Sequence, residues 1–145
     1  MIRIYKIKRK DLSQFVSLWN QEYKRLTSSQ FQMTLEKAKK GYDAKMFDYY
    51  GLYNNDVLIG FMLLKENKDL WIKHLLIDKN FRRRGLGTLF LEKAKQLAKS
   101  KKINLKTEVI KENREVIKFF LKNRFKRIKF DREGNQYILK KSYDR

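Results

Sequence analysis

One short stretch of the sequence, residues 82–88, has residue types and a spacing suited to binding phosphate. It reads Arg82-Arg83-Arg84-Gly85-Leu86-Gly87-Thr88 and lies between a predicted strand and the start of a predicted helix. Gly85 and Gly87 lack a Cβ atom, so a ligand can approach their backbone amides. The first N–H groups of a helix have no partner inside the helix, and the helix dipole adds positive potential there. With the arginine side chains and the Thr88 hydroxyl, the loop predicts a site for a phosphate or pyrophosphate.

Two common nucleotide-binding patterns are excluded for this loop. The dinucleotide fingerprint needs a third glycine where Phe90 stands, and no Gly-Lys-Ser/Thr of a P-loop follows at the required distance. The residues of the loop alone leave one alternative open, which is a basic helix start with a glycine turn and no ligand.

Few other residues of this chain can carry nucleophilic or metal chemistry. There is no cysteine and a single histidine, His74, so a thiolate nucleophile, a disulfide and a cysteine-based zinc site are excluded, and we expect no metal. Alternation along its strand places the His74 side chain on the other face of the sheet from Lys73 and Leu75, against a helix. We therefore expect a structural role for His74, with a catalytic role as the alternative.

The hydrophobic periodicity predicts the order β-α-α-β-β-β-α-β-α-β-β in one domain, residues 1–145, without linkers or internal repeats. The predicted strands are about 2–7, 48–53, 57–65, 69–77, 103–109, 125–131 and 136–141, and the predicted helices are about 11–26, 34–44, 85–100 and 113–123. Strands 69–77 and 103–109 flank a helix in a βαβ unit, so we expect them to be parallel neighbours. The fold class is therefore α+β, with a mixed sheet.

Two motifs in this arrangement resemble those of the GNAT N-acetyltransferase superfamily. Leu75-Leu76-Ile77-Asp78, followed by Phe81 and residues 82–88, resembles its acyl-CoA loop, R/Q-x-x-G-x-G/A after a strand. Glu108-Val109, Asn113 and Phe119-Phe120 through Phe125 look like its E-V-x-x-x-N and the helix ending in Gly-Phe. The order of elements matches over nearly the whole chain. The resemblance, closest to the N-terminal amine and ribosomal-protein acetyltransferase type, implies the GNAT fold, a splayed pair of strands 69–77 and 103–109, and acetyl-CoA as cosubstrate.

The resemblance also implies which residues would hold the cosubstrate. The loop amides would bind the pyrophosphate, the strand end would pair with pantetheine as an added strand, and Asn113 would contact the pantetheine arm. The implied cofactor-binding residues are Leu75, Leu76, Ile77, Arg82, Arg83, Arg84, Gly85, Leu86, Gly87, Thr88, Asn113 and Phe120.

Acetyl transfer to an amine needs a donor to the thioester carbonyl and a base for the amine. The backbone amide near Leu76 is the predicted donor and Glu108 the predicted base, the alternative for Glu108 being a surface glutamate paired with a lysine. Phe120 stands where the family commonly has a tyrosine acid, and Arg124 stands where it has the glycine of the Gly-Phe pair. Either another group, such as Tyr137 or Tyr143, supplies the proton, or the thiolate leaves unaided, or activity is weak.

The formal net charge is +20. Residues 99–145 carry 16 basic and 6 acidic side chains, so half of the net positive charge lies in this last third of the chain. This charge indicates an anionic partner, such as nucleic acid or the ribosome, or else reflects composition alone. It disfavours polyamine and cationic aminoglycoside acceptors and favours a peptide or protein amine. A nucleic-acid-binding module and a CoA-binding protein without catalysis are the alternative functions.

The longest uncharged apolar run, Val57–Leu64, is far shorter than the ~20 residues of a membrane span. The first ten residues lack the apolar segment of a signal peptide. We therefore expect a cytoplasmic protein with no membrane partner. Monomer and homodimer both remain open.

Overall fold

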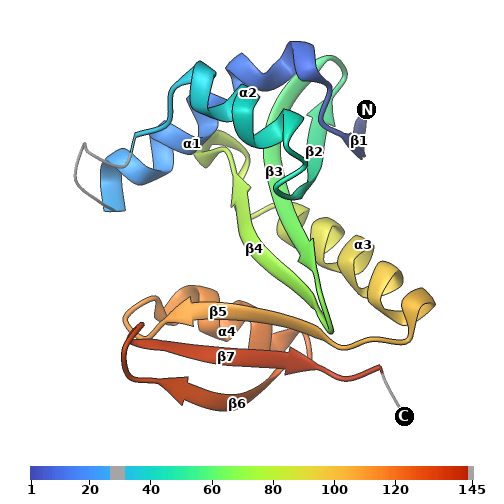
Figure 1. The fold of residues 1–145 in the computed structure, drawn as a ribbon, viewed down its shortest axis with the longest axis vertical. Helices are drawn as coiled ribbons and strands as arrows, with labels where there is room; N and C mark the ends of the chain where they lie inside the picture. The colour runs from blue at the N-terminus through green and yellow to red at the C-terminus, as the bar shows by residue number, and fades with distance from the viewer. Residues whose placement is uncertain (27–31, 144–145) are drawn as a thin grey trace. The chain divides into compact units, whose positions relative to one another are not determined.

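The computed structural model describes residues 1–26 and 32–143 (Figure 1). The strands are β1 (Ile2–Lys6), β2 (Asp48–Asn54), β3 (Val57–Glu66), β4 (Leu70–Ile77), β5 (Leu105–Ile110), β6 (Lys126–Asp131) and β7 (Gln136–Lys141). The helices are α1 (Leu12–Leu26), α2 (Leu35–Asp43), α3 (Leu86–Lys101) and α4 (Arg114–Lys122). The predicted order of elements is confirmed. The sequence pattern did not indicate two short 3₁₀ turns, η1 (Arg9–Asp11) and η3 (Lys79–Phe81), because three residues are too few for periodicity.

The strands follow the order β1-β2-β3-β4-β5-β7-β6 in one mixed sheet. The parallel pairing of β4 with β5 is confirmed and aligns Leu70–Ile72 with Leu105–Thr107. β5 and β7 pair antiparallel, as do β6 and β7, which leaves β6 at the edge of the sheet. The α+β class predicted from the sequence is therefore correct.

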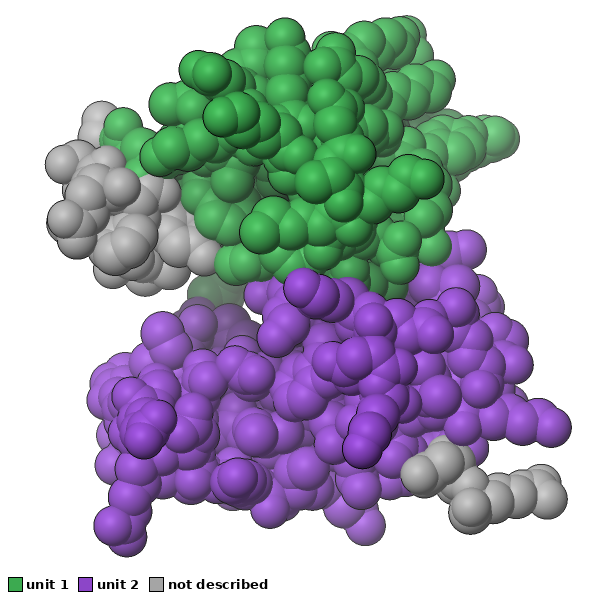
Figure 2. Space-filling model, in the orientation of Figure 1, with its two compact units in different colours: residues 1–64, 74–90 green, residues 65–73, 91–145 purple. Residues whose placement is uncertain are grey.

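The described residues divide into two compact units, shown in green and purple in Figure 2. Unit 1 comprises residues 1–64 and 74–90, and unit 2 comprises residues 65–73 and 91–145. Each unit has buried side chains of its own. That residues 1–145 form a single domain stays a prediction.

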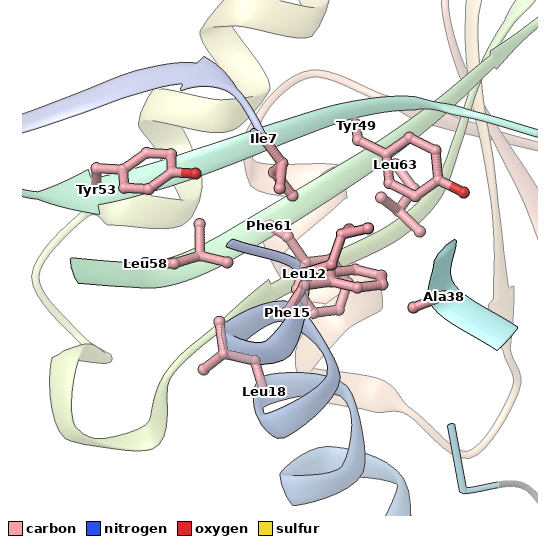
Figure 3. Close-up of a cluster of buried hydrophobic side chains, with 10 residues drawn as sticks. All are labelled: Ile7, Leu12, Phe15, Leu18, Ala38, Tyr49, Tyr53, Leu58, Phe61 and Leu63. Carbon is pink, nitrogen blue, oxygen red and sulfur yellow. The ribbon is translucent and has the colours of Figure 1, made fainter. Parts of the chain in front are cut away.

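The core of unit 1 is aromatic and packs α1 against β2 and β3 (Figure 3). The amphipathic α1 buries Leu12, Phe15 and Leu18 on one face. The Phe15 ring lies 4.8 Å from Phe61 and 5.9 Å from Tyr49 in edge-on contacts. This packing anchors α1 against the strands, and α1 in turn contacts the loop that follows β4, as described below.

In unit 2, α4 ends in a Schellman motif that explains one departure from the family pattern. The Phe125 N–H donates to the Phe120 carbonyl and the Arg124 N–H donates to the Leu121 carbonyl. The Phe120 and Phe125 rings lie 5.0 Å apart, as the apolar contact of this motif requires. Arg124 therefore takes the left-handed conformation, with φ of 74°, at the position where the family has glycine. The backbone shape is kept, although the residue that favours it is absent.

We expect Arg124→Gly to stabilise the protein by about 0.5–1 kcal/mol, because glycine adopts the left-handed conformation without the Cβ clash. Urea unfolding should show a higher midpoint. Lys122→Gly, in the last turn of the same helix, should lower it instead. A lower midpoint for Arg124→Gly would mean that the arginine side chain makes a stabilising contact that outweighs its backbone strain.

Candidate functional site

The loop between β4 and α3 combines left-handed and extended residues. Asp78 accepts a hydrogen bond on Oδ1 from the Asn80 amide, and η3 follows. Arg82 is extended, whereas Arg83 and Gly85 have φ of 62° and 74°. Left-handed residues in such a turn direct neighbouring N–H groups to one side, which creates a concave anion site. Leu86, Gly87 and Thr88 form the first turn of α3, where N–H groups have no intrahelical acceptor.

The backbone at Gly85 is open to a ligand. A Cβ atom built there would meet no other atom within 4 Å, and the residue is exposed. Arg83 holds a conformation that costs a non-glycine residue roughly 1–2 kcal/mol. Strain of this kind is typical of ligand-binding segments. Open amides, a helix start and arginine charges together fit a pyrophosphate group.

The three arginines of the loop have different surroundings. Arg82 Nε donates to the Ile77 carbonyl at 2.9 Å, and Arg82 Nη2 lies 2.6 Å from Glu22 Oε2 in α1. Its guanidinium therefore ties the loop to the end of β4 and to α1. Arg83 and Arg84 are exposed, and the Arg84 guanidinium lies 5.2 Å from the Phe81 ring. The sequence did not separate these roles, because Glu22 lies 60 residues from Arg82.

Sequence reasoning missed Gly60, which supports the end of β4 from the neighbouring strand. A Cβ at Gly60 would lie 2.8 Å from the Leu76 carbonyl oxygen and 3.0 Å from Ile77 Cδ1. The Asp78 amide also donates to the Ile59 carbonyl at 2.8 Å. The signal available in the sequence was a glycine inside an otherwise apolar strand, which marks close backbone approach. In the segment predicted to pair with pantetheine, Leu76 and Ile77 thus pack closely against β3.

His74 packs among aromatic rings of unit 1. Its ring lies 4.6 Å from Trp19 in α1 and 6.0 Å from Phe47. The prediction that His74 lies against a helix is confirmed by the Trp19 contact. The side chain is half-buried.

Glu108 lies on β5 in unit 2 and is exposed. Its Oε2 accepts a hydrogen bond from Gln136 Nε2 at 2.7 Å, and its Oε1 lies 3.8 Å from Lys73 Nζ. The lysine pairing is the one expected of a surface glutamate. The catalytic role of Glu108 stays a prediction.

Asn113 occupies the N-cap position of α4, but its side chain makes no capping hydrogen bond. Asparagine at this position ordinarily accepts such a bond. The residue is exposed, so its amide is accessible to a bound molecule.

The family's tyrosine position is filled by a core residue. Phe120 is 2% exposed and packs between Phe119 and Phe125. Of the two substitutes, Tyr137 lies 5.0 Å from the Phe130 ring. Burial, with a smaller effect from Glu92, raises the pKa of Tyr143, which makes its phenol a poorer proton donor.

Residues 1–26 and 32–143 hold no group of three or more His, Cys, Asp or Glu side chains placed to bind a metal ion. None of the helices in these ranges is long and apolar enough to cross a membrane.

The comparisons with known proteins agree with this geometry. The model of the acetyltransferase (GNAT) family matches residues 4–125, so the chain belongs to that family. Members are acetyl-CoA-dependent N-acetyltransferases, which makes the chain an acyltransferase with acetyl-CoA as its cosubstrate. The resemblance seen in the sequence is thereby confirmed. No curated protein matches the sequence.

Solved structures similar to this chain share its fold at low identity. The PaiA N-acetyltransferase of Thermoplasma acidophilum, in complex with coenzyme A, is 22% identical with a TM-score of 0.83, and the match covers 99% of both chains. An N-acetyltransferase from Staphylococcus aureus Mu50 is 18% identical with a TM-score of 0.81, again over 99% of both chains. The ribosomal-protein-S18-alanine N-acetyltransferase of Escherichia coli is 16% identical with a TM-score of 0.75, over 100% of this chain and 96% of that one.

A double-mutant cycle with Glu22→Gln and Arg82→Gln should give a coupling free energy of about 1 kcal/mol, because the pair is half-buried and 2.6 Å apart. Urea unfolding of the four proteins measures it. The exposed pair Lys6 and Asp48, 3.5 Å apart, is the matched control and should couple weakly. Equal coupling for both pairs would contradict the anchoring role of Arg82.

Proposed function

We propose that the protein transfers the acetyl group of acetyl-CoA to a primary amine of a protein or peptide. The observation that carries this proposal is the loop at residues 83–88, whose left-handed residues and open Gly85 leave backbone amides accessible at the start of α3. Membership of the acetyltransferase family supplies the reaction class. The net charge of +20 bears on the acceptor.

In this proposal the loop amides bind the pyrophosphate, with Arg83 and Arg84 adding charge-assisted donors. Arg82 keeps the loop in place through Glu22 and the Ile77 carbonyl. The backbone of Leu75–Ile77 pairs with the pantetheine arm as an added strand would. Asn113 has an uncommitted amide for the same arm, and its assignment rests on the family resemblance.

The reaction is a direct displacement at the thioester. The amine nitrogen attacks the carbonyl carbon, the C–N bond forms, the C–S bond breaks, and the amine proton is lost. The Leu76 N–H donates to the carbonyl oxygen as charge develops there. Glu108 accepts the amine proton. This role rests on the family resemblance, because Glu108 lies in unit 2 and Leu76 lies in unit 1. Phe120 has no proton to donate, so the thiolate leaves without a side-chain acid at that position.

The acceptor class follows from charge and proton affinity. A chain of charge +20 repels polyamines and cationic antibiotics over long range. An α-amine has a pKa of about 7.7–8.0, against about 10.4 for lysine, so more of it is neutral near pH 7. Glu108 is already paired with Lys73. An α-amine is therefore the favoured acceptor, because it depends least on removal of a proton by Glu108. The ribosomal-protein-S18-alanine acetyltransferase of similar fold supports an acceptor of this kind.

Gly85→Glu should abolish stabilisation by coenzyme A, because a carboxylate side chain would fill and repel the pyrophosphate site. At 100 times its dissociation constant, coenzyme A should stabilise the wild type by about 2.7 kcal/mol in a thermal-shift titration. Met46→Glu adds the same charge at an exposed position of unit 1 and should keep the shift. An unchanged shift in Gly85→Glu would place the pyrophosphate elsewhere.

Glu108→Gln should lower turnover of a peptide α-amine by on the order of a hundredfold while the coenzyme A shift is retained. The activity of the variant should depend on pH only through the acceptor amine. Glu112→Gln, an exposed neighbour bonded to Asn135, should leave turnover unchanged. An unaltered rate and pH profile for Glu108→Gln would remove it as the base, and the absence of turnover with every amine in the wild type would favour a CoA-binding protein without catalysis.

A further inference from the structure

One face of the sheet in unit 2 is open and basic. Along β5, Leu105, Thr107 and Val109 are buried, whereas Lys106, Glu108 and Ile110 alternate with them on the opposite side. Figure 1 shows α4 behind β5 and β7, on one side of these strands. The edge strand β6 is exposed over Lys126–Phe130. This part of the sheet thus has one face that α4 does not cover.

Three lysines lie in a row across this face. Lys106 of β5 is directly opposite Lys140 of β7, which is directly opposite Lys126 of β6. Like charges at directly opposed positions destabilise a sheet. Lys106 has an acidic partner, Asp69, at 2.8 Å. Among the described residues, neither Lys126 nor Lys140 lies within ion-pair distance of a carboxylate. A bound polyanion would relieve the repulsion within this row.

An aromatic ring continues the same face on β4. Trp71 pairs in register with Lys106 and is half-exposed. The ammonium groups of Lys73 and Lys106 lie 5.0 Å and 5.6 Å from the centre of its ring. Residues 122–130, which include all of β6 except its last residue, Asp131, add five basic residues. A base that stacks on this ring would displace the two ammonium groups from it and leave them to pair with the phosphates on either side.

We propose that this basic sheet face, defined by Trp71, Lys73, Lys106, Lys126 and Lys140, binds single-stranded RNA. A second copy of the chain carries the same charge of +20 and is repelled by it. The carboxylates of an acidic protein could pair with the lysines, but they would make no stacking contact with the aromatic ring. The face shares no residue with the acyl-CoA loop, but Lys73 is paired with Glu108, the proposed base. Binding of RNA can therefore be tested separately from binding of coenzyme A.

The first test is the affinity of the full chain for an oligouridylate of about 12 nucleotides, measured by fluorescence anisotropy between about 50 and 200 mM salt. Lys126→Gln with Lys140→Gln removes two phosphate contacts. It should weaken binding about 20-fold at about 0.1 M salt and make the log–log salt slope shallower by about 1.4, which is 0.7 for each contact. The coenzyme A shift of this variant should equal that of the wild type, which shows that it folds.

Lys37→Gln with Lys40→Gln, on α2 of unit 1, makes the same change in net charge and should leave the affinity close to that of the wild type. Equal losses in the two double variants would show that only overall charge matters and would overturn the proposal. Polyglutamate of matched charge binding as tightly as the oligouridylate would point to an acidic protein and would also overturn it.

The second test uses the two tryptophans of the chain. In Trp19→Phe the remaining emission comes from Trp71, and saturating oligouridylate should quench it. Trp71→Leu should weaken oligouridylate binding about tenfold, the loss of one stacked base. Unchanged Trp71 emission at saturation would exclude stacking on this ring and overturn the proposal.

Discussion

The backbone turn that carries the chain from β4 into α3 is the constraint on which the rest of this structure depends. Arg83 and Gly85 both take left-handed conformations within three residues, and the helix starts immediately after them. Such a turn aligns amide donors without any side chain, so the proposed pyrophosphate site would be built from the backbone itself. Its shape survives only if the strand before it and the helix after it keep their positions.

Several contacts in unit 1 meet that requirement. Gly60 allows β3 to approach the Leu76 carbonyl, and the Asp78 amide bonds to β3 just beyond it. Arg82 joins the loop to Glu22, and α1 is itself held by the aromatic core around Phe15. The cost of a left-handed arginine is thus offset by packing elsewhere in the unit. Arg82, which the sequence predicts to bind the cofactor, also ties the loop to β4 and α1 in the structure.

Unit 2 combines two kinds of surface. It carries Glu108 and Asn113, to which the family resemblance assigns catalytic and cofactor roles, and it carries the open lysine row on β5, β7 and β6. Glu108 lies on that same face, paired with Lys73. An RNA-binding surface on an acetyltransferase would bring the enzyme to acceptors that reside on RNA-containing particles. The excess of positive charge in residues 99–145 then has a physical use.

Local patterns in the sequence were enough to determine the order of elements, the parallel β4–β5 pair, the phosphate-type loop and the family, because periodicity, turn residues and glycine spacing act over short distances. Phe120 could be recognised from its position as a residue unable to donate a proton. Only the tertiary structure decided that Arg82 binds Glu22, that Gly60 supports Leu76, that Glu108 is paired with Lys73, and that three lysines share one face. Each of these depends on strand register or on contacts between residues far apart in the chain, which no local pattern encodes.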